Sequence, residues 1–451
     1  MRKQSNPRPV PEPDSGRFYA RRFEFGDRRL DESSGTIRLG YRLDQLELTE
    51  TFRFDAPVSV AAPRRVALEA ALDLLHWIAG VSYWKTACPP EIVFRGRHPD
   101  AWQAMALGRI YREGLAEFAW HNRLDPESWP DFPPDSVPAR PAVPAELSPG
   151  SLVPMGGGKD SLVALERARP VSRRLVTVQV GSSALIANVA RKAGTDHRTI
   201  GRELAPELTV LNESGALNGH VPITAINAAT LSVAALIWDL DSVVFANERS
   251  ADEPSLVAAD GRAINHQFAK SFAFECLFDE WIRRYVAPDL KVFSLLRRER
   301  ELAVCREFAG LGRYHPVFSS CNRNFHLEGA RTARWCGRCP KCHFVFLALA
   351  PFLDPAALTA IFGADLLADE SQHDGFRALL ALKGTKPFEC VGEVAESRSA
   401  VAHLAGHPYW RDRPVIRRLH AELPASGAPA LEELLVPAGP HRIPERFLGA
   451  A

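Results

Sequence analysis

Three consecutive glycines followed by lysine, aspartate and serine form the clearest candidate for a phosphate-binding loop in this chain. Apolar residues 151–155 precede the run and predict a buried strand, while residues 160–165 predict a helix that begins inside the loop. Glycine lets backbone N–H groups approach a ligand closely, and the N-terminus of a helix attracts negative charge. A plain glycine turn is the alternative, because the spacing matches neither the Walker loop nor the dinucleotide fingerprint. The candidate loop consists of Gly156, Gly157, Gly158, Lys159, Asp160 and Ser161.

Four of the eight cysteines are spaced as metal ligands. They form the pattern C-x14-C-x2-C-x2-C, and four thiolates with this spacing favour a closed tetrahedral zinc site with a structural role. The alternatives are an iron–sulfur cluster, reduced core cysteines, and replacement of one thiol by His343. Cys276 and Cys305 lack metal spacing and are predicted to be buried thiols. The candidate ligands are Cys321, Cys336, Cys339 and Cys342.

Two polar segments further along the chain are candidates for a substrate site. The first follows a predicted strand, and the second, at 264–275, is predicted to be helical, so that His266 and Lys270 share one face. Such a face suits an anionic substrate, although a helix with a phenylalanine core and a solvated polar side is the alternative. The polar residues of interest are Asn247, Glu248, Arg249, Ser250, Asn265, His266, Gln267, Lys270 and Ser271.

The elements that would position these residues alternate between strands and helices. Strands are predicted at 175–181, 208–212 and 241–246, and helices at 184–193 and 223–238. Strands that alternate with helices predict an α/β fold with a doubly wound parallel sheet. In such sheets ligands bind beyond the carboxyl ends of the strands, where the glycine loop and residues 247–250 fall.

The rest of the chain divides by composition into four further regions. Residues 1–16 are rich in proline and are predicted to be a disordered tail. Residues 17–125 predict a smaller mixed α+β domain, with alternating strands up to Asp55 and an amphipathic helix at 65–79. Eight prolines between 126 and 149 predict a linker or a chain wrapped over a surface. The nucleotide-binding domain with its cysteine cluster then covers 150–345, and a mainly helical segment covers 346–451.

The composition of the chain is that of an ordinary soluble protein. Of 451 residues, 46% are hydrophobic and 24% are charged, and the formal net charge of +1 marks no global surface for nucleic acid. The basic start of the chain is not followed by an apolar core, and the longest apolar stretches are too short to span a bilayer. We therefore expect a cytoplasmic protein without membrane or nucleic-acid partners.

The motifs together resemble one branch of the PP-loop ATP pyrophosphatases. The loop is similar to their Ser-Gly-Gly-Xaa-Asp-Ser sequence, with Gly156 in the place of the usual first serine. Asn-Gly-His-Val-Pro at 218–222, Asn-Glu-Arg-Ser at 247–250, Asn-His-Gln at 265–267 and the cysteine triplet resemble the ATP-dependent UDP-N-acetylmuramoyl-L-alanyl-L-glutamate epimerase family of peptidoglycan synthesis. This resemblance covers about residues 150–345 by motif.

The resemblance implies a reaction and a set of ligands. The family inverts the terminal L-glutamate of UDP-MurNAc-L-Ala-L-Glu to D-glutamate and cleaves ATP to AMP and pyrophosphate. It therefore implies ATP at the glycine loop, with Lys159 and Ser161 touching phosphate and Asp160 holding Mg²⁺ or positioning the loop. Glu248, His266 and Lys270 become candidates for proton transfer or for binding the substrate carboxylate. The implied substrate contacts are Asn247, Arg249, Ser250, Asn265, Gln267 and Ser271.

Other functions fit parts of the same pattern. The tetracysteine also resembles the 7-cyano-7-deazaguanine synthases, and other PP-loop enzymes modify tRNA, which the near-neutral charge disfavours. A non-enzymatic scaffold that binds nucleotide and zinc is the alternative outside enzymes. Pyrophosphate release that depends on substrate distinguishes these functions.

Overall fold

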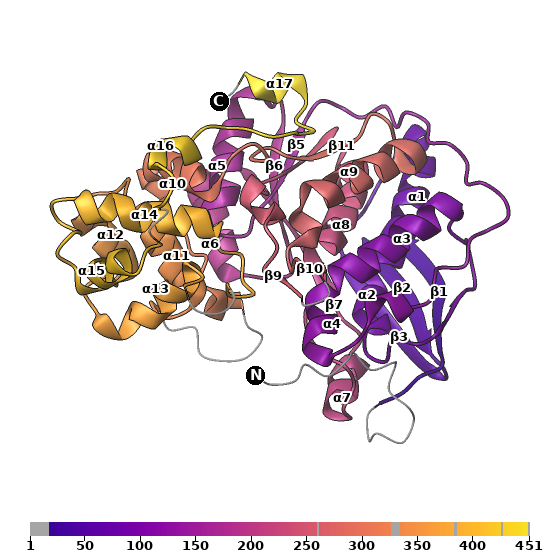
Figure 1. The fold of residues 1–451 in the computed structure, drawn as a ribbon. Coiled ribbons are helices and arrows are strands. Elements are labelled where there is room, and N and C mark those ends of the chain that lie inside the picture. Colours follow the sequence, from indigo (N-terminus) through magenta and orange to yellow (C-terminus); the bar gives the residue numbers. More distant parts are fainter. Residues whose placement is uncertain (1–17, 259–260, 326–333, 383–385, 425–426, 450–451) are drawn as a thin grey trace.

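A nine-stranded sheet crosses the protein, and helices cover both faces of its parallel part (Figure 1). The computed structural model describes residues 18–258, 261–325, 334–382, 386–424 and 427–449. The tail predicted at 1–16 lies outside these residues. The strands follow the order β11-β8-β5-β6-β7-β3-β2-β1-β4 across the sheet. Their bounds are β1 Arg22–Asp31, β2 Thr36–Leu43, β3 Leu46–Arg53, β4 Glu91–Phe94, β5 Ser151–Pro154, β6 Leu175–Val180, β7 Asp196–Glu203, β8 Ser242–Phe245 and β11 Lys291–Ser294, while β9 Leu256–Val257 and β10 Ala263–Ile264 form a separate ribbon.

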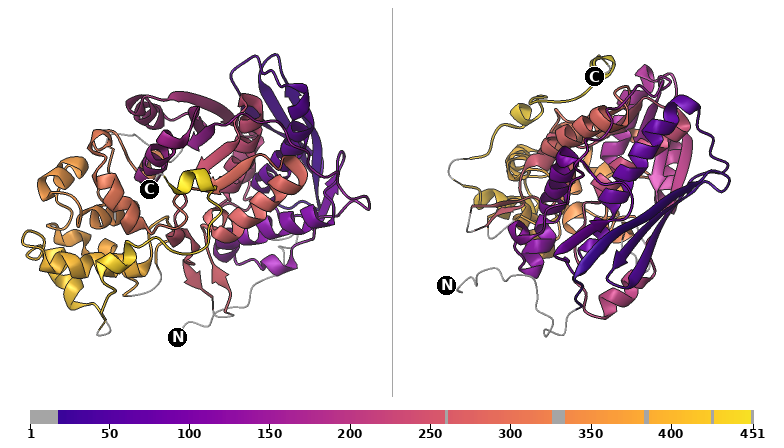
Figure 2. Two further views of the ribbon diagram at one scale, coloured as in Figure 1. Left: turned by 90° about the horizontal axis from the view of Figure 1, so that it is seen from above. Right: turned by 90° about the vertical axis from the view of Figure 1, so that its right-hand side faces the viewer.

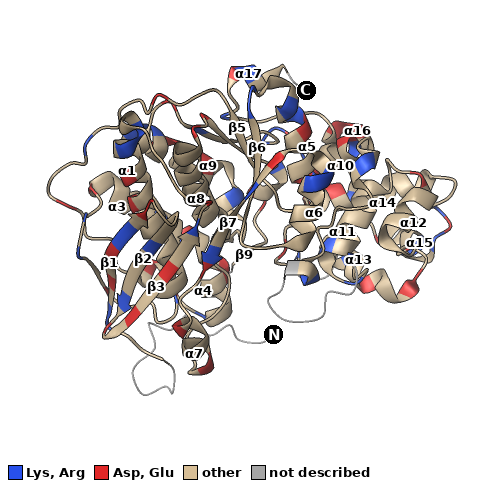
Figure 3. Cartoon of the chain, turned by 180° about the vertical axis from the view of Figure 1, so that it is seen from behind, with Lys and Arg blue, Asp and Glu red and all other residues tan. Residues whose placement is uncertain are grey.

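The sheet has a parallel part and an antiparallel part that meet between β7 and β3. Strands β11, β8, β5, β6 and β7 are parallel neighbours, whereas β7 pairs antiparallel with β3, and β3, β2 and β1 continue antiparallel. The large, mostly parallel sheet and the α/β class are confirmed. The strands predicted in the amino-terminal part extend the same sheet, and basic and acidic residues are interspersed along them (Figure 3).

Two apolar cores cover the two faces of the sheet at strands β5 and β8, because successive side chains along a strand point in opposite directions. In β5, Leu152 lies in the core that contains α1 and α8, whereas Val153 lies in the core that contains α5 and α10. Val243 and Val244 of β8 divide in the same way. Strands β5 and β8 are therefore buried on both sides, which is typical of the central strands of a parallel sheet.

Helices flank the sheet, and the carboxyl-terminal ones gather beside its parallel part (Figures 1 and 2). Residues 346–451 are mainly helical where the structure describes them, as predicted. The helices are α1 Ala62–Ala79, α2 Val81–Trp84, α3 Ala101–Gly114, α4 Ala116–Asn122, α5 Lys159–Ala168, α6 Ala184–Ala193, α7 Glu207–Glu213, α8 Ile223–Trp238, α9 Phe272–Trp281, α10 Glu301–Ala309, α11 Pro340–Leu349, α12 Pro355–Phe362, α13 His373–Leu379, α14 Val394–Gly406, α15 Pro414–Ala421, α16 Leu431–Leu434 and α17 Glu445–Leu448.

One predicted strand is wrong. Residues 208–212 lie in helix α7, and the strand of this unit is β7, at 196–203. Val210 in α7 is 61% exposed, so the apolar run does not form a buried strand. β7 contains no apolar run that would predict it, because most of its side chains are polar and only Ile200 is fully buried.

The proline-rich segment 126–149 forms one 3₁₀ turn, at Pro126–Ser128, and otherwise no helix or strand. It runs along the protein and is held by side-chain and backbone contacts. The amide of Ala142 donates to the carbonyl oxygen of Arg284 (2.8 Å), and the Asp289 carboxylate accepts from the amides of Ala145 (2.8 Å) and Leu147 (3.1 Å). Its conformation is that of a chain wrapped over a surface.

Among the described residues, one helical stretch is long and apolar enough to cross a membrane by length and composition. It covers Ala62–Trp84, and 83% of its apolar window is buried inside the protein. Core helices pass the same test, so this stretch carries no membrane assignment.

Candidate active site

The glycine loop follows β5 at the carboxyl end of the parallel strands. Gly157 has a φ of 78°, and a Cβ atom there would lie 2.5 Å from Leu185 Cδ2, so a larger residue would fit neither the backbone nor the space. A Cβ on Gly158 would lie 2.6 Å from Ser320 Oγ, and the amide of Ser319 donates to the Gly157 carbonyl oxygen (2.9 Å). Gly156, in contrast, is exposed and faces open space. The loop is thus packed on one side and open on the other.

Helix α5 begins directly from this loop. Its N-cap is Gly158, which has no side chain to cap the amides of the first turn. The Ser161 hydroxyl donates to the Gly158 carbonyl oxygen (3.1 Å) and accepts from the Gly156 amide (3.4 Å), which holds the loop against the helix. Loop amides and a positive helix end at an open surface form the kind of cradle that binds phosphate.

Lys159 points away from the open side of the loop. Its side chain is 1% exposed, and its ammonium group forms ion pairs with the carboxylates of Asp160 and Glu301. Burial disfavours the charged lysine, but these two carboxylates outweigh it and hold the Lys159 pKa well above its usual value. Burial, followed by the charge of Asp160, raises the pKa of Glu301 to about 7. A direct contact of Lys159 with phosphate would require these ion pairs to open.

The polar residues after β8 lie beside this charged cluster. Glu248 is buried, and burial together with the charge of Asp160 raises the pKa of its carboxyl group. Asn247 donates to the Ser294 hydroxyl (3.0 Å), and the Ser250 hydroxyl donates to a carboxylate oxygen of Glu396 (2.8 Å). Ser250 is therefore engaged within the fold. Arg249 is half-buried.

The predicted helix at 264–275 is wrong in its first half. Helix α9 begins only at Phe272, because the Ser271 hydroxyl accepts from the Phe274 amide (3.2 Å) and acts as its N-cap. Before it, the Asn265 side chain accepts from the Gln267 amide (2.8 Å) and donates to the Ala251 carbonyl oxygen (3.0 Å), which favours a turn. Residues Phe268–Lys270 form a 3₁₀ turn. The roles of Asn265 and Ser271 in this structure are thus backbone contacts.

His266 and Lys270 nevertheless lie close together, because both reach the same third side chain, Cys390. The Lys270 ammonium group donates to Cys390 Sγ (3.0 Å), and His266 Nε2 lies 3.8 Å from the same sulfur. The other ring nitrogen of His266 is hydrogen-bonded to the Ser255 hydroxyl (2.8 Å). Burial, then the charge of Lys270, lowers the pKa of His266 to about 3, so this imidazole is neutral at physiological pH.

Sequence reasoning missed Cys390, Glu117 and Glu301. They come from the carboxyl-terminal segment, α4 and α10, and none has a spacing relative to the motifs that would mark it. Glu117 also contacts His220 of the 218–222 motif, with 3.4 Å between the carboxylate oxygen and Nδ1. Burial, followed by the charge of Cys390, raises the pKa of Glu117 to about 7. The fold therefore brings ionisable groups from distant parts of the sequence together near the loop.

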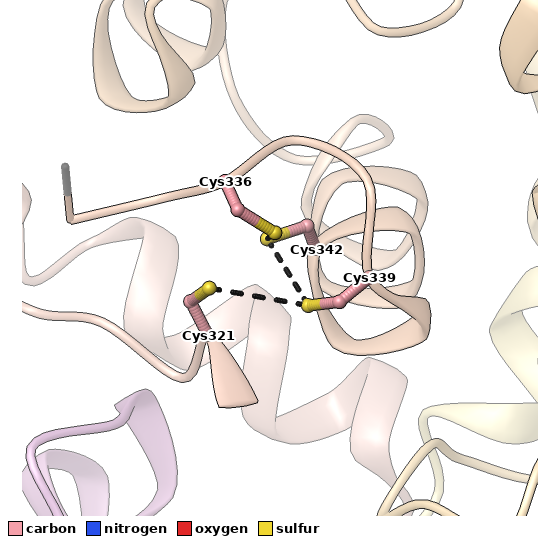
Figure 4. Close-up of side chains that lie close together, drawn as sticks. All are labelled: Cys321, Cys336, Cys339 and Cys342. Atoms are coloured by element: carbon pink, nitrogen blue, oxygen red, sulfur yellow. Dashed lines mark hydrogen bonds between the residues drawn. The ribbon is translucent and has the colours of Figure 1, made fainter. Parts of the chain in front are cut away.

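The four predicted metal ligands converge (Figure 4). Their sulfur atoms lie within 4.8 Å of one another, with 3.5 Å between Cys339 and Cys342 and 3.7 Å between Cys336 and Cys342. Sulfurs about 3.8 Å apart are expected around a tetrahedral zinc with Zn–S bonds of about 2.3 Å. The cluster could therefore hold a metal ion. Among the described residues His343 is not part of it, because its Nε2 bonds Gln372 instead (2.8 Å).

The other two cysteines considered in the sequence lie outside this cluster. Cys305 is fully buried in α10, as predicted. Cys276 in α9 is only half-buried.

The chain matches known proteins over most of its length. The family described as the MurL N-terminal domain matches residues 16–295, and the MurL C-terminal domain matches residues 317–433. A protein from Xanthomonas oryzae pv. oryzae is 45% identical over 94% of this chain and 95% of its own length. Relatives from Micromonospora sp. and Salinispora tropica are 41% and 40% identical, each over 95% of this chain and over 97% and 95% of their own lengths. All three are named UDP-N-acetyl-alpha-D-muramoyl-L-alanyl-L-glutamate epimerase. With both domain families and full-length relatives matched, the chain belongs to the MurL family.

Proposed function

We propose that this protein epimerises the terminal L-glutamate of UDP-MurNAc-L-Ala-L-Glu to D-glutamate, in the synthesis of peptidoglycan precursors. The observation that carries the proposal is the 45% identity, over almost the whole of both chains, to a protein named for this epimerase activity. The proposed substrate, UDP-MurNAc-L-Ala-L-Glu, is a small soluble molecule. The proposal accordingly places the enzyme in the cytoplasm, without nucleic-acid or membrane partners.

The chemistry requires the glutamate carboxyl group to be activated first. The Cα–H bond next to an ionised carboxylate is a very weak acid, because its deprotonation adds negative charge to an anion. Adenylation by ATP removes the carboxylate charge and makes the carbonyl group an electron acceptor. A side chain can then remove the α-proton, a proton returns on the opposite face, and hydrolysis releases the D-product with AMP. Pyrophosphate leaves in the adenylation step.

The glycine loop is the proposed site of ATP, in a fold of the PP-loop pyrophosphatase type. The open side at Gly156 and the uncapped first turn of α5 support phosphate binding there. Loop amides would stabilise the negative charge of the departing pyrophosphate. Mg²⁺, bound by phosphate oxygens with Asp160 as the candidate protein ligand, would supply further charge neutralisation. Ser161 would hold the loop in place.

The ionisable groups beside the loop divide into binding and proton-transfer candidates by their charge states. Burial opposes the charge of Lys270, but Cys390 and Glu248 outweigh it and raise its pKa, so it stays a cation that suits a substrate carboxylate. His266 is neutral and Glu248 binds its proton more tightly than an ordinary glutamate, so both can exchange protons. Asn247, Arg249 and Gln267 are the candidates for polar contacts to the dipeptide.

The cysteine cluster is proposed to hold one structural zinc ion. Its four thiolates would close the coordination sphere and leave no position for a substrate or water. The backbone next to it supports the glycine loop, since the Cys321 amide donates to the Ser319 hydroxyl (3.1 Å) and the Ser319 amide donates to Gly157. Zinc would therefore stabilise the wall of the nucleotide site rather than take part in the reaction.

The reaction itself is tested with purified protein, Mg²⁺, ATP and UDP-MurNAc-L-Ala-L-Glu in D₂O. We expect AMP, pyrophosphate and a D-glutamyl product that carries deuterium at the glutamate α-carbon, measured by chiral analysis and mass spectrometry. Free L-glutamate should react poorly, because it lacks the nucleotide-sugar end that orients the substrate.

Three other outcomes would contradict the proposal. ATP cleavage that leaves the α-hydrogen and its configuration intact would favour an amidating or ligating enzyme. Modification of tRNA would place the protein with the other PP-loop enzymes. Nucleotide binding without any pyrophosphate release would favour a scaffold.

A further inference from the structure

Cys390 reaches the candidate site from a part of the sequence far from the other site residues. It lies 120 positions after Lys270 and 124 after His266, and its sulfur contacts both side chains. The sulfur accepts from the Lys270 ammonium group at 3.0 Å, which is a short contact for a hydrogen bond to sulfur. The thiol is half-buried, so it is neither sealed in the core nor open on the surface.

The segment around Cys390 is anchored over the residues that follow β8. The buried Lys386 ammonium group pairs with the Glu253 carboxylate (2.7 Å), which also accepts from the Val394 amide (3.3 Å). The Phe388 ring lies 6.3 Å from the ring of His266 and 5.2 Å from that of His121. Contacts before and after Cys390 in the sequence therefore hold the sulfur in position.

The charges around Cys390 favour its thiolate form. Burial opposes ionisation, but Lys270 above all outweighs it, and the pKa of the Cys390 thiol falls below its usual value. His266 contributes no charge of its own, because burial and then Lys270 lower the pKa of its imidazole and keep it neutral. A thiolate is the form that accepts a proton, and a nearby ammonium group is a common way to stabilise it.

The influence of Asp160 on Cys390 indicates that this sulfur lies near the proposed site of activation. The Asp160 carboxylate lies at the first turn of α5, next to the phosphate cradle, and is close enough to Cys390 to influence its ionisation. An acyl adenylate formed at the loop beside Asp160 would thus lie near Lys270 and Cys390. The same Lys270 could pair with a substrate carboxylate and with the thiolate.

We propose that the Cys390 thiolate removes the α-proton of the activated glutamyl residue, an assignment that rests on the epimerase function proposed above. The Cα–H bond breaks, its electron pair moves onto the acyl oxygen as an enolate, and the proton forms an S–H bond. A proton from a second acid that exchanges with solvent then adds to the opposite face as the enolate collapses. Exchange with solvent restores the thiolate and the second acid. Lys270 keeps the sulfur ionised and in place.

The test separates adenylation from proton transfer in Cys390→Ser and Cys390→Ala, using the full-length protein. Adenylation is followed as exchange of labelled pyrophosphate into ATP with the dipeptide substrate, and proton transfer as deuterium at the α-carbon in D₂O. We expect both variants to lose deuterium incorporation by at least about 100-fold, the usual range for loss of a general base. Pyrophosphate exchange should stay within about threefold of the wild-type rate. Cys276→Ser, which changes a half-buried thiol outside the cluster, should retain both activities.

The outcomes distinguish this role from a purely positional one and from failure of the proposed function. If Cys390 only held Lys270, the serine hydroxyl would still accept its hydrogen bond, and only the alanine variant would be impaired. That result, or an equal loss of both activities in both variants, would overturn the assignment. A wild-type protein that neither epimerises nor incorporates deuterium would overturn the epimerase function itself. Active wild type with active Cys390 variants would overturn the role of Cys390 alone.

Discussion

The glycine loop and the ionisable cluster around Cys390 lie side by side but are built in opposite ways. The loop is six consecutive residues between one strand and one helix, and its shape follows from glycine conformations and helix geometry. The cluster is assembled from α4, the 218–222 motif, the turn before α9 and the carboxyl-terminal segment. Local backbone thus prepares the phosphate site, whereas long-range packing prepares the proton-transfer site.

This difference implies that the two halves of the reaction can be separated by mutation. Changes in the loop should remove the activation step and everything that follows from it. Changes in the cluster should leave activation largely intact, since the cluster contributes charges rather than the shape of the loop. The predictions below use this asymmetry, from the largest expected effect to the smallest.

Replacement of Asp160 or Ser161 by alanine should abolish both activities together. Either change removes a group of the loop that positions phosphate, and losses of about 100-fold or more are typical when a contact to developing charge is removed. AMP formation and deuterium incorporation should fall in parallel, while circular dichroism shows a folded protein. The matched control is Asp196→Ala, an exposed aspartate at the start of β7, which should have wild-type activity. Normal AMP formation in both loop variants would contradict the assignment of the loop.

Loss of the metal should affect folding before it affects either half of the reaction. We expect one zinc per chain by elemental analysis, and Cys336→Ser should lower the melting temperature by about 5 °C or more, because metal binding by a closed thiolate site is coupled to folding. The folded fraction should keep similar ratios of adenylation to proton transfer. Cys276→Ser is again the control, with an unchanged melting temperature. Iron with sulfide, or no metal in protein purified without chelator, would contradict the zinc assignment.

The contiguous elements were predictable because their signals are local. The loop, the cysteine spacing, and the strands and helices at 151–155, 175–181, 184–193 and 223–238 all appear in the structure. Each depends on glycine positions, ligand spacing or apolar periodicity over a few residues. The six loop residues are consecutive in the sequence, so no tertiary contact is needed to know that they lie together.

The remaining features depend on contacts that no short window contains. The strand β7 was missed because its polar side chains lie beside the antiparallel strand β3, whose pairing is a tertiary property. The turn around His266 replaced the expected helix because Asn265 and Ser271 cap backbone groups there. Cys390 had no motif around it, and its importance arises only where the chain folds back on Lys270.

The last prediction tests the cluster by moving one ionisation in opposite directions. In Lys270→Met the cation that stabilises the Cys390 thiolate is removed, so the pKa of the thiol should rise and proton transfer should require a higher pH. Because a nearby opposite charge typically shifts a pKa by about 1 or more, we expect the thiol pKa to rise by at least that amount.

The Glu117→Gln variant removes a carboxyl group whose own pKa is raised to about 7, first by burial and then by Cys390. Because that repulsion is reciprocal, the thiol pKa should fall, by less than about 1 unit. The groups that face the sulfur are Lys270, His266, Lys341, Asp160 and Glu117.

The measurement is the rate of deuterium incorporation between about pH 6 and pH 10, divided by the rate of pyrophosphate exchange at each pH, so that effects on activation cancel. The midpoint of the ratio should move upward in Lys270→Met and downward in Glu117→Gln. Lys192→Met, the same change at an exposed position of α6, should leave the midpoint in place. Shifts of the same sign in both variants would mean that the titrating group is not the sulfur between them. Opposite shifts would show that the proton-transfer step titrates with Cys390, because Lys270 and Glu117 are distant from each other in the sequence and both act on this sulfur.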